Sequence, residues 1–323
     1  AFGPGNDYIF FFKVVPTIIF VAVLVNMFYH LGILQRVVSF MGKGVHWLMG
    51  VSGAEALSNV ASTFVGQVEA QIMIKPYLKN MTNSELMASM TGSFACIAGG
   101  VMAVYISLGV PAAYLLAASL MAAPGALVIS KIMFPETEKS ETEGEVKLEL
   151  SKTHANLVDA IAAGASEGLK VGLNVIAMLI GFIALIALVD LGLGHIGAWM
   201  NYPELSMNTI LGKVFSVFAF AMGVPSQDIE VAGALMGKKM VVNEFVAYLD
   251  MVNLKATLDP KTIAITSFAL CGFANFSSVA IQIGGIGELA PSRRSDLAKL
   301  GFKALIAGTL ASYLSATLAG LLL

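Results

Sequence analysis

Two glutamates, Glu69 and Glu244, lie in a very apolar chain, and each has an amide side chain close by. Gln67 precedes Glu69 by two residues, and Asn243 directly precedes Glu244. A charged carboxylate near the centre of a bilayer costs on the order of 3 kcal/mol, so in a membrane protein such residues are functional candidates. Carboxylate and amide groups with acceptors in excess favour a neutral solute with several hydroxyl groups over an anion.

The composition is that of a membrane protein. Of the 323 residues, 57% are hydrophobic and only 12% are charged, whereas soluble domains are roughly 45–50% apolar. Several windows of about 20 residues are almost free of charge, as membrane-spanning helices require. The net charge of −2 provides no basic surface for a nucleic acid. We therefore predict an all-α, multi-pass protein of the cell (inner) membrane, surrounded by the lipid bilayer and without a nucleic-acid partner.

Enzyme motifs are absent from the sequence. There is no His-Glu-x-x-His, no Gly-x-Ser-x-Gly and no Walker loop. The four histidines are scattered without the spacing of metal ligands. Cys96 and Cys271 lie in apolar runs, and we interpret them as buried thiols rather than a disulfide. We therefore predict no catalytic residues and a function in transport or binding.

Short segments of the first half recur in the second half in the same order. Met49-Gly50-Val51 returns as Met222-Gly223-Val224, at an offset of 173 residues. Ser93-Phe94-Ala95 returns as Ser267-Phe268-Ala269, at an offset of 174. The two glutamates are related by a similar offset, 175. This nearly constant spacing indicates an internal repeat.

The repeat predicts the organisation of the chain. We expect a first repeat over 1–134, a charged linker with an amphipathic helix over 135–167, and a second repeat over 168–323. The polar stretches around the two glutamates, at about 52–76 and 225–250, are too short for two crossings each and predict re-entrant hairpins.

The full prediction has about six transmembrane spans, two interfacial helices, two re-entrant hairpins and two broken helices. Three crossings per half, an odd number, invert the second repeat relative to the first. Inverted repeats with broken segments are typical of secondary transporters, whose substrate and ion sites lie at the breaks.

Three stretches resemble the signature segments of the concentrative nucleoside transporter family. They are 65–70 (Val-Gly-Gln-Val-Glu-Ala), 242–248 (Val-Asn-Glu-Phe-Val-Ala-Tyr) and 271–278 (Cys-Gly-Phe-Ala-Asn-Phe-Ser-Ser). The resemblance covers nearly the whole chain. It implies cation-coupled nucleoside uptake by a homotrimer, in which the hairpin-bearing part moves like an elevator against a scaffold. Family members usually carry further helices before the first span, which implies a shortened, bacterial member here.

The resemblance also assigns binding roles, position by position. The base-binding role falls on Gln67, Val68, Glu69 and Val101. The ribose-binding role falls on Glu244, Asn275 and Ser278, and Phe273 and Val171 would form apolar walls. The sodium-binding positions are Ser62, Val65, Cys96 and Ile97.

This chain departs from the family pattern at several of these positions. Val68 and Cys96 stand where the family usually has hydroxyl residues, Ser62 stands where it often has asparagine, and Gln71-Ile72 replaces Pro-Leu. The resemblance favours sodium as the coupling ion. Because Na⁺ prefers oxygen to sulfur, the thiol of Cys96 is a poor ligand for it, and a proton is the alternative coupling ion.

Two alternative functions and the substrate preference stay open. The chain could be an inverted-repeat symporter of another polar solute, such as a nucleobase, or a membrane receptor that does not transport. The choice between purine and pyrimidine nucleosides also stays open.

Overall fold

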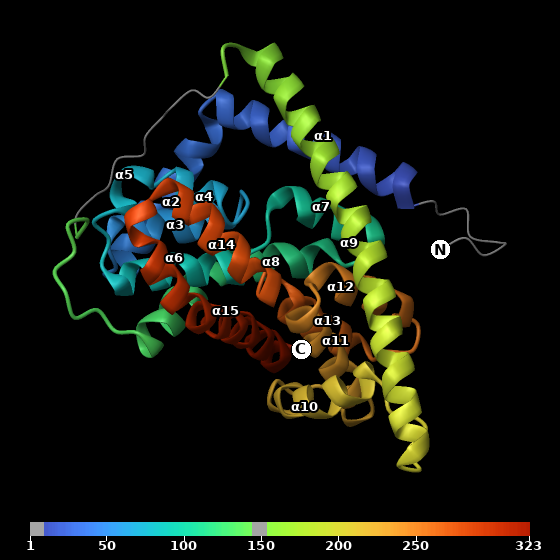
Figure 1. Ribbon diagram of the computed structural model, residues 1–323. Helices are drawn as coiled ribbons and strands as arrows, with labels where there is room; N and C mark the ends of the chain where they lie inside the picture. Colours follow the sequence, from blue (N-terminus) through green and yellow to red (C-terminus); the bar gives the residue numbers. More distant parts are fainter. Residues whose placement is uncertain (1–9, 144–153) are drawn as a thin grey trace.

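The computed structural model describes residues 10–143 and 154–323, and every regular element within these ranges is a helix. The predicted all-α class is therefore confirmed. In Figure 1, α1 and α9 lie along the outside of a body that the other helices form.

The first half contains α1 (Phe10–His30), α2 (Ile33–Met49), α3 (Gly53–Ser62), α4 (Glu69–Ile72), α5 (Lys75–Leu78), α6 (Asn83–Ala95), α7 (Gly99–Leu108) and α8 (Ala112–Met133). The second half contains α9 (Leu157–Trp199), α10 (Met207–Ala221), η1 (Ser226–Asp228), α11 (Ile229–Val241), α12 (Glu244–Leu254), α13 (Pro260–Leu270), α14 (Phe276–Leu289), η2 (Pro291–Arg293) and α15 (Arg294–Leu322).

The number of potential membrane spans roughly matches the prediction. Among the described residues, four helical segments are long and apolar enough to cross a bilayer: Asn83–Leu108, Ala112–Met133, Leu157–Trp199 and Pro291–Leu322. A fifth results if α1 and α2, which are bent by 75° relative to each other, form one span. The remaining predicted crossing consists of α13 and α14, with 11 and 14 residues. Neither arm alone reaches across roughly 30 Å of hydrocarbon.

Both halves present their elements in the same order. A long helix is followed by a shorter one, a helical hairpin, a helix with a break and a closing helix. The hairpins differ in their returning arms, because α4 and α5 are single turns of four residues each, whereas α12 has 11 residues. The predicted boundary between 167 and 168 falls inside α9, which is one continuous helix of 43 residues.

The two broken helices are interrupted where they meet. Cys96 ends α6 in an extended conformation, with ψ at 160°. Gly272, just after α13, has φ at +139°, a region that residues with a Cβ rarely adopt. A Cβ on Gly272 would also lie 2.7 Å from the carbonyl oxygen of Phe94. The backbone N–H of Phe273 donates to the carbonyl oxygen of Cys96 at 3.3 Å. The two breaks therefore lie against each other inside the protein.

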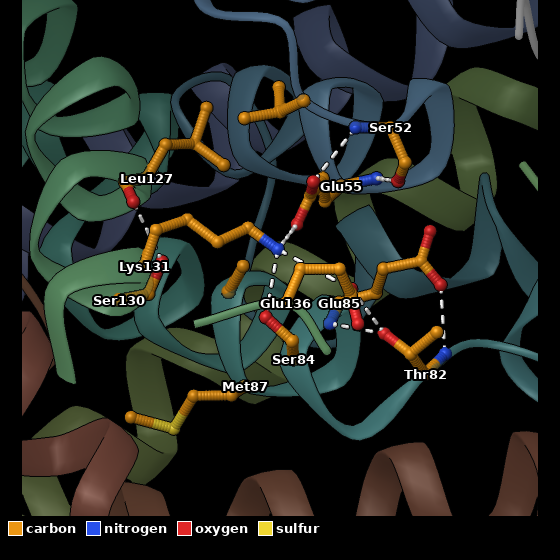
Figure 2. Close-up of polar contacts among 12 residues, drawn as sticks. Ser52, Glu55, Thr82, Ser84, Glu85, Met87, Leu127, Ser130, Lys131 and Glu136 are labelled. Atoms are coloured by element: carbon orange, nitrogen blue, oxygen red, sulfur yellow. Dashed lines mark hydrogen bonds and ion pairs between the residues drawn. The ribbon is translucent and has the colours of Figure 1, made fainter. Parts of the chain in front are cut away.

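Capping boxes begin both α3 and α6. The Ser52 hydroxyl accepts from the backbone N–H of Glu55, whose carboxylate accepts from the backbone N–H of Ser52, and Thr82 and Glu85 do the same for α6. This reciprocal capping satisfies N–H groups that a helix start leaves unpaired. Figure 2 shows that Glu55 also faces Lys131 of α8, at 2.7 Å from Oε2 to Nζ.

The segment after α8 contacts the same group of residues, through Lys131 and Glu85. Lys131 donates to the Ser84 hydroxyl at 2.9 Å and lies 3.7 Å from the Glu136 carboxylate. Farther along, Ser140 and Thr142 donate to Glu85. In the second half, Asp228 at the hairpin start accepts from the start of α13, so the hairpin base and the broken helix are joined in both halves of the chain.

The outer pair α1 and α9 is held by close backbone packing. Gly164, Gly168 and Gly172 lie four residues apart on α9 and face α1. A Cβ on Gly168 would lie 2.6 Å from the Cα of Ile19. Small residues at this spacing allow helices to approach closely in a membrane.

Replacing Gly168 with leucine is expected to destabilise the protein by about 1–3 kcal/mol, because the added side chain forces α1 away from α9. A lower melting temperature in detergent would be the readout. Gly192→Leu is the matched control on the same helix, since a Cβ there meets nothing within 4 Å. Equal melting temperatures of the two variants would contradict this account of the α1–α9 contact.

Candidate functional site

Glu244 occupies the turn of the second hairpin. It is the first residue of α12 and is only 5% exposed. Its Oε1 accepts from the Tyr105 hydroxyl at 3.0 Å, and its Oε2 accepts from Nδ2 of Asn275 at 3.1 Å. A carboxylate has about four acceptor sites, so both oxygens retain capacity for a ligand's hydroxyl groups. The carboxylate is therefore fixed in orientation and still able to bind.

Asn275 connects this carboxylate to the second broken helix. It is the N-cap of α14, and its Oδ1 accepts from the backbone N–H of Ser278 at 2.9 Å and from the Ser277 hydroxyl at 2.7 Å. An asparagine at this position starts a helix well because its side-chain oxygen satisfies an unpaired N–H. Its amide group is then directed to Glu244. One residue thus starts α14 and positions the carboxylate.

The turn of the first hairpin lies against the same helix. Nε2 of Gln67 donates to the Ser278 hydroxyl at 3.5 Å, and Oε1 of Gln67 accepts from Gln282 at 3.4 Å. Both hydrogen bonds are long and therefore weak, so the Gln67 amide can replace them with hydrogen bonds to a ligand. Val68 packs beside Gly285, where a Cβ would lie 2.6 Å from a Val68 methyl group. The structure therefore brings Gln67, Val68, Glu244, Asn275 and Ser278 to one region between the hairpins.

Other predicted binding residues surround this region less directly. Val101 and Phe273 are half-buried and pack against the hydrophobic core that contains Tyr105. Glu69 begins α4 and is exposed, with its carboxylate folded over Gly66. Within the described ranges, no hydrogen bond or ion pair joins the Glu69 carboxylate to another residue. Val171 lies on α9 and is 42% exposed.

The four predicted sodium-binding residues are all buried at the junction of the first hairpin with the first break. Ser62 ends α3, and Val65 lies in the turn that follows. Cys96 and Ile97 form the break itself. The Cys96 thiol contacts the Thr63 hydroxyl at 3.7 Å. Among these four residues, the oxygen donors suited to a hard cation are the Ser62 hydroxyl and the backbone carbonyl groups.

A polar network occupies the space beside Ser62. The Ser62 hydroxyl donates to the carbonyl oxygen of Ser58 at 2.8 Å and contacts the Ser93 hydroxyl at 3.2 Å. Gln71, fully buried, donates to Ser93 at 2.9 Å and accepts from Ser89 at 2.6 Å. Gln71 thus holds the first hairpin against α6.

Sequence reasoning missed Tyr105, Gln282 and the partners of Gln71. Gln282 had a usable signal, because Asn275, Ser278 and Gln282 follow each other at spacings of three and four and share one face of α14. Tyr105 lies in an apolar helix without a local pattern. Only the requirement that a buried tyrosine hydroxyl find a partner could have suggested its role.

Two family models together match most of the chain. Residues 114–320 match the family model described as "Na+ dependent nucleoside transporter C-terminus", and residues 11–112 match the one described as "Nucleoside recognition". An uncharacterized transporter of Haemophilus influenzae is 48% identical, over 98% of this chain and 77% of that protein. The nucleoside permease NupC of Helicobacter pylori is 41% identical, over 98% and 76%.

A solved structure agrees in fold as well as in sequence. The structure of CNTnw in an inward-facing, substrate-bound state superposes with a TM-score of 0.92 at 42% identity, covering 97% of this chain and 75% of that one. The homologues are transporters and not enzymes, and together with the apolar helices they indicate a multi-pass protein, located in the inner membrane in bacteria. The chain belongs to the concentrative nucleoside transporter family.

Proposed function

We propose that this chain carries nucleosides into the cell together with a cation. The arrangement around Glu244 is the observation that supports this most directly. Its fixed carboxylate, with Asn275 and Ser278 beside it, suits the donor hydroxyls of a ribose. Gln67, whose hydrogen bonds are long, suits the edge of a base. Glu69, Val68, Val101, Phe273 and Val171 complete the proposed nucleoside site.

We further propose that the two hairpins are re-entrant and that α2 and α10 lie at the membrane interface. In α2, Phe40, Trp47 and Leu48 are strongly exposed, while Gln35, Val38 and Gly42 are buried. Such a helix suits the boundary between lipid and water. The body that holds both hairpins would move like an elevator against α1 and α9. Apolar exposed residues along α9, such as Ile180, Leu188 and Leu191, suit contact with lipid and with the other subunits of a homotrimer.

The coupling cation is a co-substrate, and sodium is the first candidate because the matched family model names it. Ser62, Val65, Cys96 and Ile97 would hold it through one hydroxyl and backbone carbonyl groups. A proton is the second candidate. It is favoured by the thiol at Cys96 and by the hydrogen bonds that already engage the Ser62 hydroxyl.

Uptake of radiolabelled uridine and adenosine into proteoliposomes tests the proposal. We expect an imposed cation gradient to accelerate uptake, and the paired variant Glu69→Gln, Glu244→Gln to abolish it. Uptake by that variant at the wild-type rate would refute nucleoside transport through this site. Acceleration by a sodium gradient alone supports sodium, whereas acceleration by a pH gradient alone supports the proton.

Two further readouts separate the alternatives. Thermal stabilisation by nucleobases but not by nucleosides would favour a symporter of another solute. Saturable nucleoside binding without any uptake or cation dependence would favour a receptor.

A further inference from the structure

Lys239 is a buried cation that lacks a carboxylate partner. It lies on α11, the first arm of the second hairpin, and is 1% exposed. Its Nζ donates to the carbonyl oxygen of Ala269 at 2.9 Å and to the Ser312 hydroxyl at 3.4 Å. None of the ion pairs in the described ranges includes Lys239, whereas its neighbour Lys238 pairs with Asp250. A charged group buried in this way is costly unless its surroundings compensate it.

The compensation comes from the end of a helix. Ala269 is in the last turn of α13, directly before the break, and Ser312 also donates to the carbonyl oxygen of Cys271 at 3.0 Å. The last carbonyl groups of a helix lack intrahelical partners and together carry a negative partial charge. The ammonium of Lys239 therefore neutralises the carbonyl end of α13 at the point where the chain leaves the helix.

The first half has the same junction without the ammonium. Ala95, in the last turn of α6, is the repeat counterpart of Ala269. At offsets of 174 and 175, the counterparts of Lys239 are Val65 and Phe64, which are apolar. The carbonyl end of α6 thus faces the first hairpin with no basic side chain at the matching position. This is also the junction where Ser62, Val65, Cys96 and Ile97 lie.

We propose that Lys239 acts as a tethered cation, which supplies at the second junction the positive charge that the free coupling cation supplies at the first. The inference rests on the proposed cation-coupled transport. Lys239 fixes the α13 side of the break, while Glu244 fixes the α14 side through Asn275. Lys239 is therefore a positioning residue for the nucleoside site, and the second junction takes up no free ion.

Neutral variants of the two neighbouring lysines test this proposal in the full-length protein. Lys239→Met is expected to weaken nucleoside binding about 10-fold or more, because hydrogen bonds made by a charged donor at the break are lost. Lys238→Met, the matched control from the same helix, is expected to stay within about threefold of the wild-type affinity, since its partner Asp250 is partly exposed to water. Wild-type affinity of Lys239→Met would overturn the proposal.

Chemical rescue separates a charge role from a packing role. In Lys239→Ala, methylammonium or ethylammonium is expected to restore nucleoside affinity, while the bulkier tetramethylammonium is not. If Lys239→Ala does not fold alone, the same small amines are expected to restore a monodisperse protein during purification. If neither small amine restores nucleoside affinity or a monodisperse protein, the tethered-cation role is refuted. Absence of cation-coupled uptake by the wild-type protein would instead refute the proposed function itself.

Discussion

Replacing Glu244 with glutamine is expected to weaken nucleoside binding by about 100-fold while the protein remains folded. Hydrogen bonds to a charged acceptor contribute about 1.5–3 kcal/mol each, and the ribose hydroxyls would lose this acceptor. Glutamine has nearly the same shape, and its oxygen can still accept from Tyr105. Its amide group, however, would face the donating amide of Asn275, which removes the present arrangement of donor and acceptor. Calorimetric titration of uridine or adenosine into the purified protein measures the effect.

Tyr105→Phe is the control for this variant. It removes one donor to Glu244 but keeps the carboxylate and the Asn275 contact, so we expect a loss of about 10-fold or less. The aromatic packing of Tyr105 against Tyr248, with ring centroids 4.5 Å apart, is retained by phenylalanine. A Glu244→Gln protein that binds nucleosides within threefold of the wild type would contradict the role assigned to the carboxylate.

Replacing Lys131 with methionine is expected to cause the largest loss of stability, about 3–5 kcal/mol. Glu55 is 2% exposed, and Lys131 contacts its Oε2 at 2.7 Å, so the substitution leaves a buried carboxylate without a counter-charge. The same lysine also holds Ser84 and Glu136 (Figure 2), so the start of α6 and the segment after α8 would loosen together. The melting temperature in detergent should fall by many degrees.

The double variant Glu55→Gln, Lys131→Met isolates the cause. Glutamine can still accept from the backbone N–H of Ser52 and complete the capping box, yet it carries no charge to compensate. We expect the double variant to regain most of the stability lost by Lys131→Met. If the double variant is less stable than the single one, the ion pair does not explain the effect of Lys131.

The part of the site that could be predicted from the sequence consists of polar residues within apolar stretches, because a protein buries such residues at a cost and therefore for a function. Glu244 and Asn275 could be identified in this way, and the structure places them in direct contact. The position of Glu69 could not be predicted from its residue type. A hairpin turn can direct a side chain inward or outward, and in this structure Glu69 is exposed while Gln67 meets α14.

The boundaries of the helices were harder to predict than their existence. The predicted boundary at 167/168, between an amphipathic helix and a span, lies inside α9, which continues through Gly164 and Gly168. Glycine lowers helix propensity by only about 1 kcal/mol, and close packing of these residues against α1 compensates for it. Such compensation depends on a partner helix that is distant in sequence, so local patterns do not reveal it.

The hydrogen bond between Phe273 and Cys96 has a mechanical consequence. Each break supplies one of its two partners, and the backbone of Gly272 lies against the carbonyl group of Phe94. A change in the backbone of one break therefore disturbs a contact of the other. The two halves of the chain, although each carries its own hairpin, are coupled at the point where their helices are interrupted.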